Sequence, residues 1–312
     1  MNATGLAITG SSIPKDLVWD VSPYHYIPTQ WITILFLVLF GISGALHIAE
    51  AVLFRLWFLF PTAILSVFGE LIGWSGRLWS TYNIPLDTPF LMQLSSTIIA
   101  PTPFLAGIFV IFGRITRRLG PQYSRLTPRM YTIIFCTSDV VALVLQAFGG
   151  GLASGSSESS VKLGTRIMLA GISFQLAIIS IFMLLVLEYL IRYHIDHPVR
   201  APMTQATSSQ DTLGSPMPIE WTANGPRGLV DKRLKLMIIG MCFSTLCLFI
   251  RSIYRTIELA DGWDGRIIGT QVYFNVLDGT MVFLAIFTLN VFHPGFLLRA
   301  AGSSNRSFLE KP

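Results

Sequence analysis

Long apolar runs separated by short polar segments dominate the pattern along this chain. A membrane-crossing helix needs about 20 mostly apolar residues. Seven stretches reach that length, at approximately 29–48, 56–76, 90–112, 130–149, 167–187, 235–257 and 267–292. None of them alternates apolar and polar residues with the period of two that is typical of a barrel strand. Because backbone groups in lipid must be hydrogen-bonded internally, the pattern predicts a bundle of seven transmembrane helices.

The composition excludes several classes of protein. Of the 312 residues, 52% are hydrophobic and only 12% are charged, whereas an ordinary soluble domain has about 25% charged residues. A soluble enzyme, a disordered chain and a nucleic-acid binder are therefore excluded. The three cysteines all lie in apolar runs and form no disulfide framework or metal-binding motif. We expect an all-α multi-pass membrane protein whose surroundings are membrane lipids.

The distribution of Lys and Arg predicts the orientation. With the N-terminus outside, 15 of the 22 basic residues lie in cytoplasmic loops or in the C-terminal tail, as the positive-inside rule requires. The predicted organisation is an extracellular tail (1–28), a membrane domain (29–292) and a cytoplasmic tail (293–312). Pro, Ser, Thr and Gln predict a disordered cytoplasmic loop at 194–228. A weak glycosylation sequon begins at Asn2.

Polar and ionisable residues inside the predicted spans are the candidate functional residues. A charge at a helix centre costs at least ~2.5–3.5 kcal/mol, so each one requires a reason. The candidates are Glu70, Arg77, Asp139, Gln146, Gln175, Arg251, Arg255, Glu258, Asn275 and Asp278. Within each helix they share a face, because they are three, four or seven residues apart. We expect these faces to line one volume, which is deepest at mid-membrane and opens outward.

Two interpretations of these residues remain open. They form interhelical ion pairs that stabilise packing, or they line a substrate path. Arg255 is placed to pair locally with Glu258 or across the bundle with Glu70 and Asp278. Asp139 and Asp278 are expected near mid-depth with no Lys or Arg at that level. For these two acids, a ligand cation or a proton is the expected partner.

The pattern offers no metal or cofactor site. The five histidines lie outside the predicted spans or at their ends: His25, His47, His194, His197 and His293. They cannot reach the mid-membrane carboxylates, so a buried three-histidine zinc site is not expected. The last span contains no lysine for a retinal Schiff base, and the chain has no ATP-binding motif. We expect neither a metal nor another cofactor, and no enzymatic activity.

Several short motifs follow one another in a specific order. They are Glu70-Leu-Ile-Gly73-Trp74-Ser-Gly-Arg77, Ala100-Pro101, Asp139-Val-Val-Ala-Leu-Val-Leu-Gln146 with Gly149-Gly150-Gly151, Arg251-Ser252-Ile-Tyr254-Arg255-Thr-Ile-Glu258, and Asp278 followed by His293-Pro294-Gly295. In this order, the motifs resemble those of the fungal RTA-like proteins, also called the lipid-translocating exporter family. The chain departs from the family pattern at three positions, Gln271, Asn275 and Phe109, where the family commonly has Glu, an aromatic residue and Tyr.

The resemblance implies seven helices with the N-terminus outside and a role in moving, or giving tolerance to, amphiphiles. In that family these are sphingoid long-chain bases, aminosterols or porphyrins. We therefore expect export or translocation of amphiphilic lipids, giving resistance to them, without an ATPase of its own. A seven-helix lipid sensor is the alternative, and an intramembrane lipid hydrolase is a weaker one. The expected location is the plasma membrane, with an internal membrane such as the ER or vacuole as the alternative.

Overall fold

The computed structural model describes residues 19, 22–155, 157–199, 230–263 and 265–299. Within these residues, seven helical segments are long and apolar enough to cross a membrane, which confirms the predicted number of spans. They are Gln30–Phe54, Trp57–Tyr82, Asp87–Leu119, Pro128–Ala153, Glu158–Ile195, Lys232–Asp261 and Gln271–Val291. The predicted Asn2 sequon, most of the predicted loop and most of the predicted cytoplasmic tail lie outside the described residues.

Four of the spans are single continuous helices. They are α2 (Gln30–Phe54), α6 (Pro128–Ala153), α7 (Glu158–Ile195) and α8 (Lys232–Asp261). These helices extend beyond their predicted limits, because apolarity marks the hydrocarbon region whereas helical hydrogen bonding continues into the polar ends. In α7, for example, the first turns carry an ion pair between Lys162 and Glu158, at 2.5 Å.

The other three spans are interrupted. The second contains η1 (Trp57–Leu59), a π-helical segment η2 (Phe60–Ile64) and α3 (Leu65–Tyr82). The third is divided into α4 (Asp87–Ile99) and α5 (Pro101–Leu119). The break falls directly before Pro101, because proline has no N–H to continue the helical hydrogen bonds. The last span contains α9 (Gln271–Tyr273), a second π-helical segment η4 (Phe274–Thr280) and α10 (Met281–Val291), and α11 (Pro294–Arg299) follows it.

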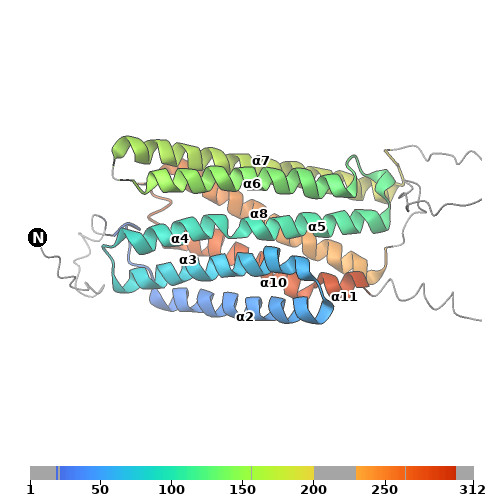
Figure 1. The fold of residues 1–312 in the computed structure, drawn as a ribbon, viewed down its shortest axis with the longest axis horizontal. Helices are drawn as coiled ribbons and strands as arrows, with labels where there is room; N and C mark the ends of the chain where they lie inside the picture. Colours follow the sequence, from blue (N-terminus) through green and yellow to red (C-terminus); the bar gives the residue numbers. More distant parts are fainter. Residues whose placement is uncertain (1–18, 20–21, 156, 200–229, 264, 300–312) are drawn as a thin grey trace, which may run out of the picture.

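The helices run along the long axis of the molecule (Figure 1). Helices α6 and α7 lie together on one side, α2 lies on the opposite side, and α8 crosses the bundle obliquely. The α3–α4 and α6–α7 connections lie at the end where α2 begins, here called the N-terminal end, and the α5–α6 connection lies at the opposite, C-terminal end. This alternation of connections is what seven successive spans require. Which end faces the cytoplasm remains a prediction from the basic residues.

The interior differs between the two halves of the bundle. Towards the C-terminal end, aromatic residues pack edge to face, as Phe109 does with Phe182 at a centroid separation of 4.7 Å. The other half contains the buried charges. Close helix contact there depends on small residues: a Cβ on Gly279 of η4 would lie 2.6 Å from the Trp74 ring of α3. The last span therefore packs directly against the second, and this contact brings their polar residues together.

Candidate functional site

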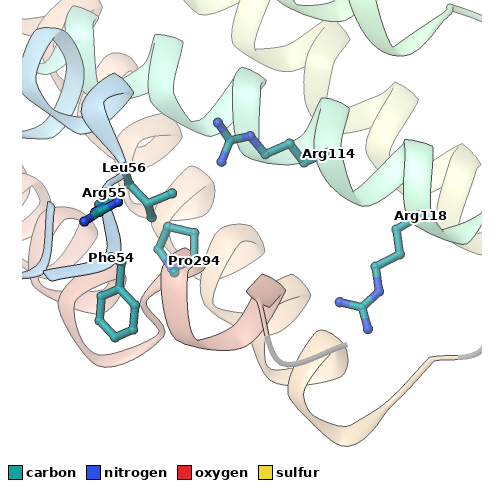
Figure 2. Close-up of a pocket in the computed structure, with 7 residues that line it drawn as sticks. Phe54, Arg55, Leu56, Arg114, Arg118 and Pro294 are labelled. Carbon is teal, nitrogen blue, oxygen red and sulfur yellow. The ribbon is translucent and has the colours of Figure 1, made fainter. Parts of the chain in front are cut away.

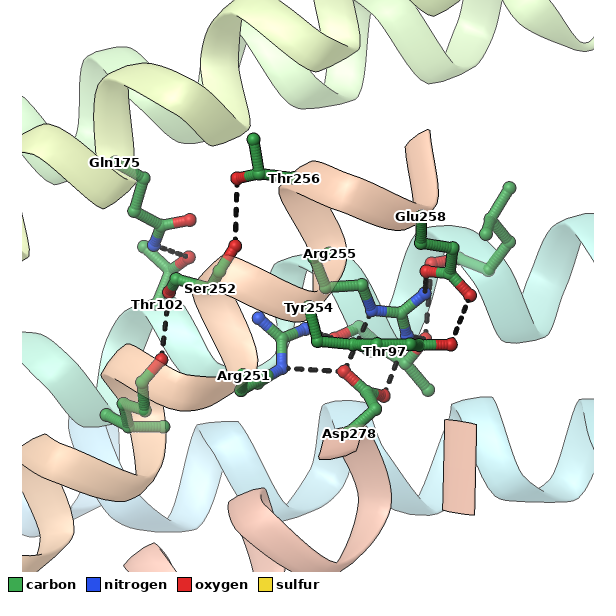
Figure 3. A network of polar contacts seen from close by, with 12 residues as sticks. Thr97, Thr102, Gln175, Arg251, Ser252, Tyr254, Arg255, Thr256, Glu258 and Asp278 are labelled. Carbon is green, nitrogen blue, oxygen red and sulfur yellow. Dashed lines mark hydrogen bonds and ion pairs between the residues drawn. The ribbon is translucent and has the colours of Figure 1, made fainter. Parts of the chain in front are cut away.

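Arg255 is the centre of a buried ionic network (Figure 3). Its Nε and Nη2 atoms donate to the two carboxylate oxygens of Asp278, at 2.8 and 2.7 Å. Its Nη1 donates to Glu258 Oε2 at 2.8 Å, and Nη2 also donates to Thr97 Oγ1 at 2.8 Å. Planar guanidinium and carboxylate groups form this two-point geometry preferentially. The network therefore joins α8, η4 and α4 in one rigid arrangement.

Two further side chains complete the network. Arg251 Nε lies 2.9 Å from Asp278 Oδ1, and Arg251 also donates to the Thr97 carbonyl. The Tyr254 hydroxyl donates to Glu258 Oε1 at 2.6 Å. Arg255 and Asp278 are only 2% and 1% exposed. Removing one residue of such a pair would leave its partner as an uncompensated charge in a medium of low polarity.

The expectation that Asp278 lacks an arginine partner is wrong. Two arginines, Arg251 and Arg255, contact it. Depth estimated from sequence places Cα atoms, whereas a long arginine side chain carries its charge several ångströms from its own backbone. Both pairings expected for Arg255 form, the local one with Glu258 and the cross-bundle one with Asp278. The structure shows no hydrogen bond between the described residues Arg255 and Glu70.

Glu70 and Asn275 are two further polar residues among the predicted candidates. Their side-chain oxygens form no hydrogen bond with the described network residues. Both Glu70 oxygens and Asn275 Oδ1 are buried and have no hydrogen-bond partner among the described residues. Glu70 nevertheless interacts electrostatically with Asp278 and with Arg251 and Arg255. Trp74, one helical turn further along α3, is the neighbouring polar side chain with which Glu70 also interacts.

Arg77 lies on the same helix face as Glu70 but closer to the N-terminal end, where it shares the Phe274 ring with Arg255. Its guanidinium donates to the Tyr26 hydroxyl at 2.7 Å and to Gln93 Oε1 at 3.3 Å. It also lies 4.5 to 5.9 Å from the centroids of four aromatic rings, those of Phe274, Tyr24, Tyr26 and Trp74. These contacts compensate its charge by cation–π attraction, without a carboxylate.

The segment before α2 covers this end of the polar core. The Tyr24 hydroxyl lies 3.1 Å from Ser80 Oγ. Burial raises the pKa of Tyr24 to about 12, so its hydroxyl remains protonated at neutral pH. The cavity between Tyr24, Arg77 and Glu258 has a volume of only about 10 Å³, enough for one water molecule at most. In this conformation Tyr24 and Tyr26 close this end of the polar core, and the expected outward-opening volume stays a prediction.

Asp139 lies in a different environment, between α6 and α7. It is 1% exposed. Its Oδ1 accepts a 3.1 Å hydrogen bond from Gln175 Nε2, while Oδ2 is buried and has no hydrogen-bond partner among the described residues. Gln175 also donates to Thr102 Oγ1 at 3.2 Å, and its Oε1 accepts from Gln146 Nε2 at 3.0 Å. In the described part of the chain, no Lys, Arg or His forms an ion pair with Asp139.

A cavity of about 490 Å³ opens next to this amide chain, between α4, α6 and α7. Gln146 lines it, which connects the cavity to Gln175 and Asp139 through hydrogen bonds. Most of its other lining residues are apolar or carry hydroxyl groups: Thr88, Leu91, Met92, Ser95, Ser96, Ile98, Ile99, Ala147, Gly150, Gly151, Ser154 and Met168. A volume of 300–1,000 Å³ with a few convergent polar groups is typical of a small-molecule site.

Comparison with known proteins agrees with this architecture. The family model described as "RTA1 like protein" matches residues 63–301, which include the second to the seventh span. The chain belongs to the RTA1-like family. No solved structure matches it.

Three relatives of this RTA1-like protein come from Saccharomyces cerevisiae. The sphingoid long-chain base transporter RSB1 is 29% identical over 89% of this chain and 75% of its own length. The protein RTA1 is 26% identical over 87% of this chain and 84% of its own. The protoporphyrin uptake protein 1 is 28% identical over 71% of this chain and 64% of its own. The resemblance expected from the motifs is confirmed, and two of these relatives are named for transport or uptake.

Sequence reasoning missed five polar residues that this RTA1-like protein uses around its buried charges. They are Tyr26, Gln93, Thr97, Thr102 and Tyr254. Gln93 and Thr97 are four residues apart in the third span, a spacing that puts both on one helix face. That spacing could have identified them. Nothing in the sequence pattern indicates that Tyr26, which lies before the first helix, folds back over Arg77.

The histidines also differ from expectation in one respect. His47 lies inside α2, because that helix continues to Phe54 rather than ending near residue 48. His47 Nδ1 and His293 Nε2 lie 3.8 and 3.7 Å from Glu50 Oε2. Among the described residues, no group of three or more His, Cys, Asp or Glu side chains is arranged to hold a metal ion.

Proposed function

We propose that this RTA1-like protein translocates amphiphiles that carry a cationic amine, of the sphingoid long-chain base type, across the membrane without an ATPase of its own. Exported amphiphiles would be removed from the cell, and cells would resist them. Membrane lipids and a small amphiphilic substrate are the proposed partners, and the plasma membrane is the proposed location. The related transporter RSB1, whose name specifies sphingoid long-chain bases, supports this choice of substrate class.

One observation carries the proposal: Asp139 is a buried acid with no cationic partner among the described residues, and hydrogen bonds through Gln175 and Gln146 connect it to the cavity. A carboxyl group in such a place needs a proton or a cationic ligand. An ammonium head group would supply the missing charge. The apolar lining residues of the cavity would contact the beginning of the alkyl chain.

Translocation further requires that the N-terminal end opens. In the present conformation, the Tyr26 hydroxyl accepts a hydrogen bond from Arg77, and the Tyr24 hydroxyl is hydrogen-bonded to Ser80. These two contacts close the N-terminal end of the polar core. We infer that they separate during the transport cycle, while the Arg255 network maintains the packing of the helices beneath them. Alternating access of this kind places the binding site near the bilayer midplane.

Transport of a fluorescent sphingoid base in vesicles reconstituted with the purified protein tests the proposal. We expect the rate of movement between leaflets to fall at least tenfold in Asp139→Asn. The fold should persist, because an asparagine at this position still accepts the Gln175 N–H and no longer requires burial of a charge. Asp87→Asn is the matched control, since Asp87 is an exposed acid at the start of α4.

Each outcome of this experiment is informative. Full transport by Asp139→Asn would contradict the proposed site. Binding of the labelled base by the wild-type protein without movement between leaflets would favour a lipid sensor, and a change in the mass of the lipid would indicate a hydrolase. Loss of transport in both variants would indicate an effect of surface charge instead of the buried acid.

The orientation is a separate proposal with its own test. We propose that the N-terminal end faces outside, because the basic residues concentrate at the C-terminal end. Single cysteines at Ser157 and Ser209, in a background without the native cysteines, should differ in labelling by an impermeant reagent on intact cells. Labelling at Ser157 alone is expected, and labelling at Ser209 alone would reverse the orientation.

A further inference from the structure

A cavity of about 500 Å³ lies at the C-terminal end of the bundle, away from the candidate transport site (Figure 2). It lies between the turn that follows α2, one face of α5 and the start of α11. Its lining residues are Phe54, Arg55, Leu56, Arg114, Arg118, Pro294 and Gly295. Three of the seven lining residues are arginines, and none of them is acidic.

The backbone holds these arginines around the cavity. Arg114 and Arg118 are four residues apart on α5 and therefore share a helix face. Arg55 ends α2 in the left-handed conformation, with φ 53°, and this sharp turn places it across the cavity from α5. The Arg114 guanidinium lies 4.2 Å from the centroid of the Phe58 ring, and it points towards Arg55 and Leu56. Aromatic contact orients this guanidinium and leaves its N–H groups available.

Their positive charge has no counterpart among the described residues. None of the three arginines forms an ion pair with a described carboxylate, and Arg118 Nη1 is buried without a described hydrogen-bond partner. Arg125 and Arg192 provide the contrast, because both bind Glu188, at 2.7 to 2.8 Å. What distinguishes Arg55, Arg114 and Arg118 is that the three charges, unpaired in the described part of the chain, converge on one cavity. An anionic ligand would supply the missing partner.

The apolar surface beside the cavity places it at the level of the lipid. Leu53 and Trp57, on either side of Arg55, are 74% and 64% exposed. Exposed tryptophan at the end of a membrane-spanning helix is typical of the boundary between hydrocarbon and head groups, and the exposed leucine would contact the hydrocarbon beside it. The walls formed by Phe54, Leu56 and Pro294 would contact carbon atoms of a ligand whose anionic group binds the arginines. This combination fits an amphiphile better than a free ion.

We propose that this cavity binds the phosphate-monoester head group of an anionic membrane lipid. A phosphate monoester carries a charge of about −1.5 to −2 at neutral pH and three acceptor oxygens, which three guanidinium groups can match. Guanidinium groups bind phosphate through paired hydrogen bonds. With the proposed orientation, the lipid belongs to the cytoplasmic leaflet, which is rich in anionic lipids. The site is separate from Asp139, so its test does not depend on the transported substrate.

Native mass spectrometry of the detergent-purified protein tests this proposal. The probes are dioctanoyl phosphatidic acid, dioctanoyl phosphatidylcholine and soluble glycerol 3-phosphate. We expect one phosphatidic acid molecule per chain, with at least tenfold weaker binding in the double variant Arg114→Gln/Arg118→Gln. Arg117→Gln is the matched control, because Arg117 is an exposed arginine on the same helix that does not line the cavity.

Three results would overturn the proposal. Equal retention of phosphatidic acid by the double variant and the wild type would exclude the cavity as the site. An equal loss in Arg117→Gln would show general attraction by surface charge. Equally tight binding of glycerol 3-phosphate would assign the site to soluble phosphate esters instead of a lipid. If the double variant does not fold, Arg55→Gln provides the same test from the exposed turn, with a loss expected and unchanged binding contradicting the site.

Discussion

Asp278 and Asp139 are both almost completely buried acids in the membrane domain, yet their environments differ. Asp278 contacts two guanidinium groups within 3 Å, and its neighbours on α8 and α4 complete the network. Asp139 receives one amide hydrogen bond, has one oxygen without a described partner and lies next to a chain of amides that reaches a cavity. The two acids therefore have the same chemistry but different electrostatic compensation.

The difference in electrostatic compensation suggests different roles for Asp278 and Asp139. A carboxylate that is fully paired with arginines contributes to the arrangement of helices, and its removal leaves buried positive charge. A carboxylate without a cation costs free energy in the folded state, so its presence requires another explanation, such as a ligand. The Arg251, Arg255, Glu258 and Asp278 group forms the ion pairs of the first interpretation, and we propose that these pairs stabilise the packing. We keep the substrate-site proposal for Asp139.

The largest expected effect follows from removing the centre of the network. Arg255→Ala would leave Asp278 and Glu258 without their principal partner, and we expect a loss of about 3–5 kcal/mol in unfolding free energy. Unfolding of the purified protein in micelles of increasing SDS content measures it, together with membrane abundance by immunoblot. Adding Glu258→Gln should partly restore abundance. Arg266→Ala, at an exposed arginine near the same end, is the control. Normal stability of Arg255→Ala would mean that water reaches the network.

Neutralising each acid in turn compares the two regions directly. Asp278→Asn should lower the unfolding free energy by about 2–3 kcal/mol, because the arginines lose a charged hydrogen-bond partner. Asp139→Asn should leave stability unchanged or slightly increased, since it removes a desolvation cost. The same SDS titration measures both variants, and each serves as the control for the other. Equal destabilisation by the two substitutions would remove the distinction between the regions.

The smallest expected effect compares two threonines of the interrupted third span. Thr97 accepts a hydrogen bond from Arg255, whereas Thr102 accepts one from the neutral Gln175 amide. We expect Thr97→Val to cost about 1.5–3 kcal/mol and Thr102→Val about 0.5–1.5 kcal/mol, because bonds to charged groups are stronger. Unfolding free energies from SDS titration distinguish the two values. A larger effect at Thr102 would indicate that the Asp139 region contributes more to packing than its charges suggest.

The seven spans and the family were accessible from the chain alone. Hydrocarbon thickness requires about 20 apolar residues whatever the helix packs against, so the runs predict the helices independently of tertiary contacts. The polar faces were also accessible, because residues at intervals of three, four and seven share a face in any helix. The break at Pro101 follows from its missing N–H, and the order of the motifs was sufficient for the family.

The pairing of the charges depends instead on the tertiary arrangement. Local periodicity does not state which face meets which, so Asp278 and Asp139 were indistinguishable until α8 was placed beside η4 and α6 beside α7. The closure of the N-terminal end by Tyr24 and Tyr26, and the meeting of Arg55 with α5, join residues about 50 or more positions apart. Such contacts depend on how long side chains fill the space between packed helices, and helical periodicity carries no information about that packing.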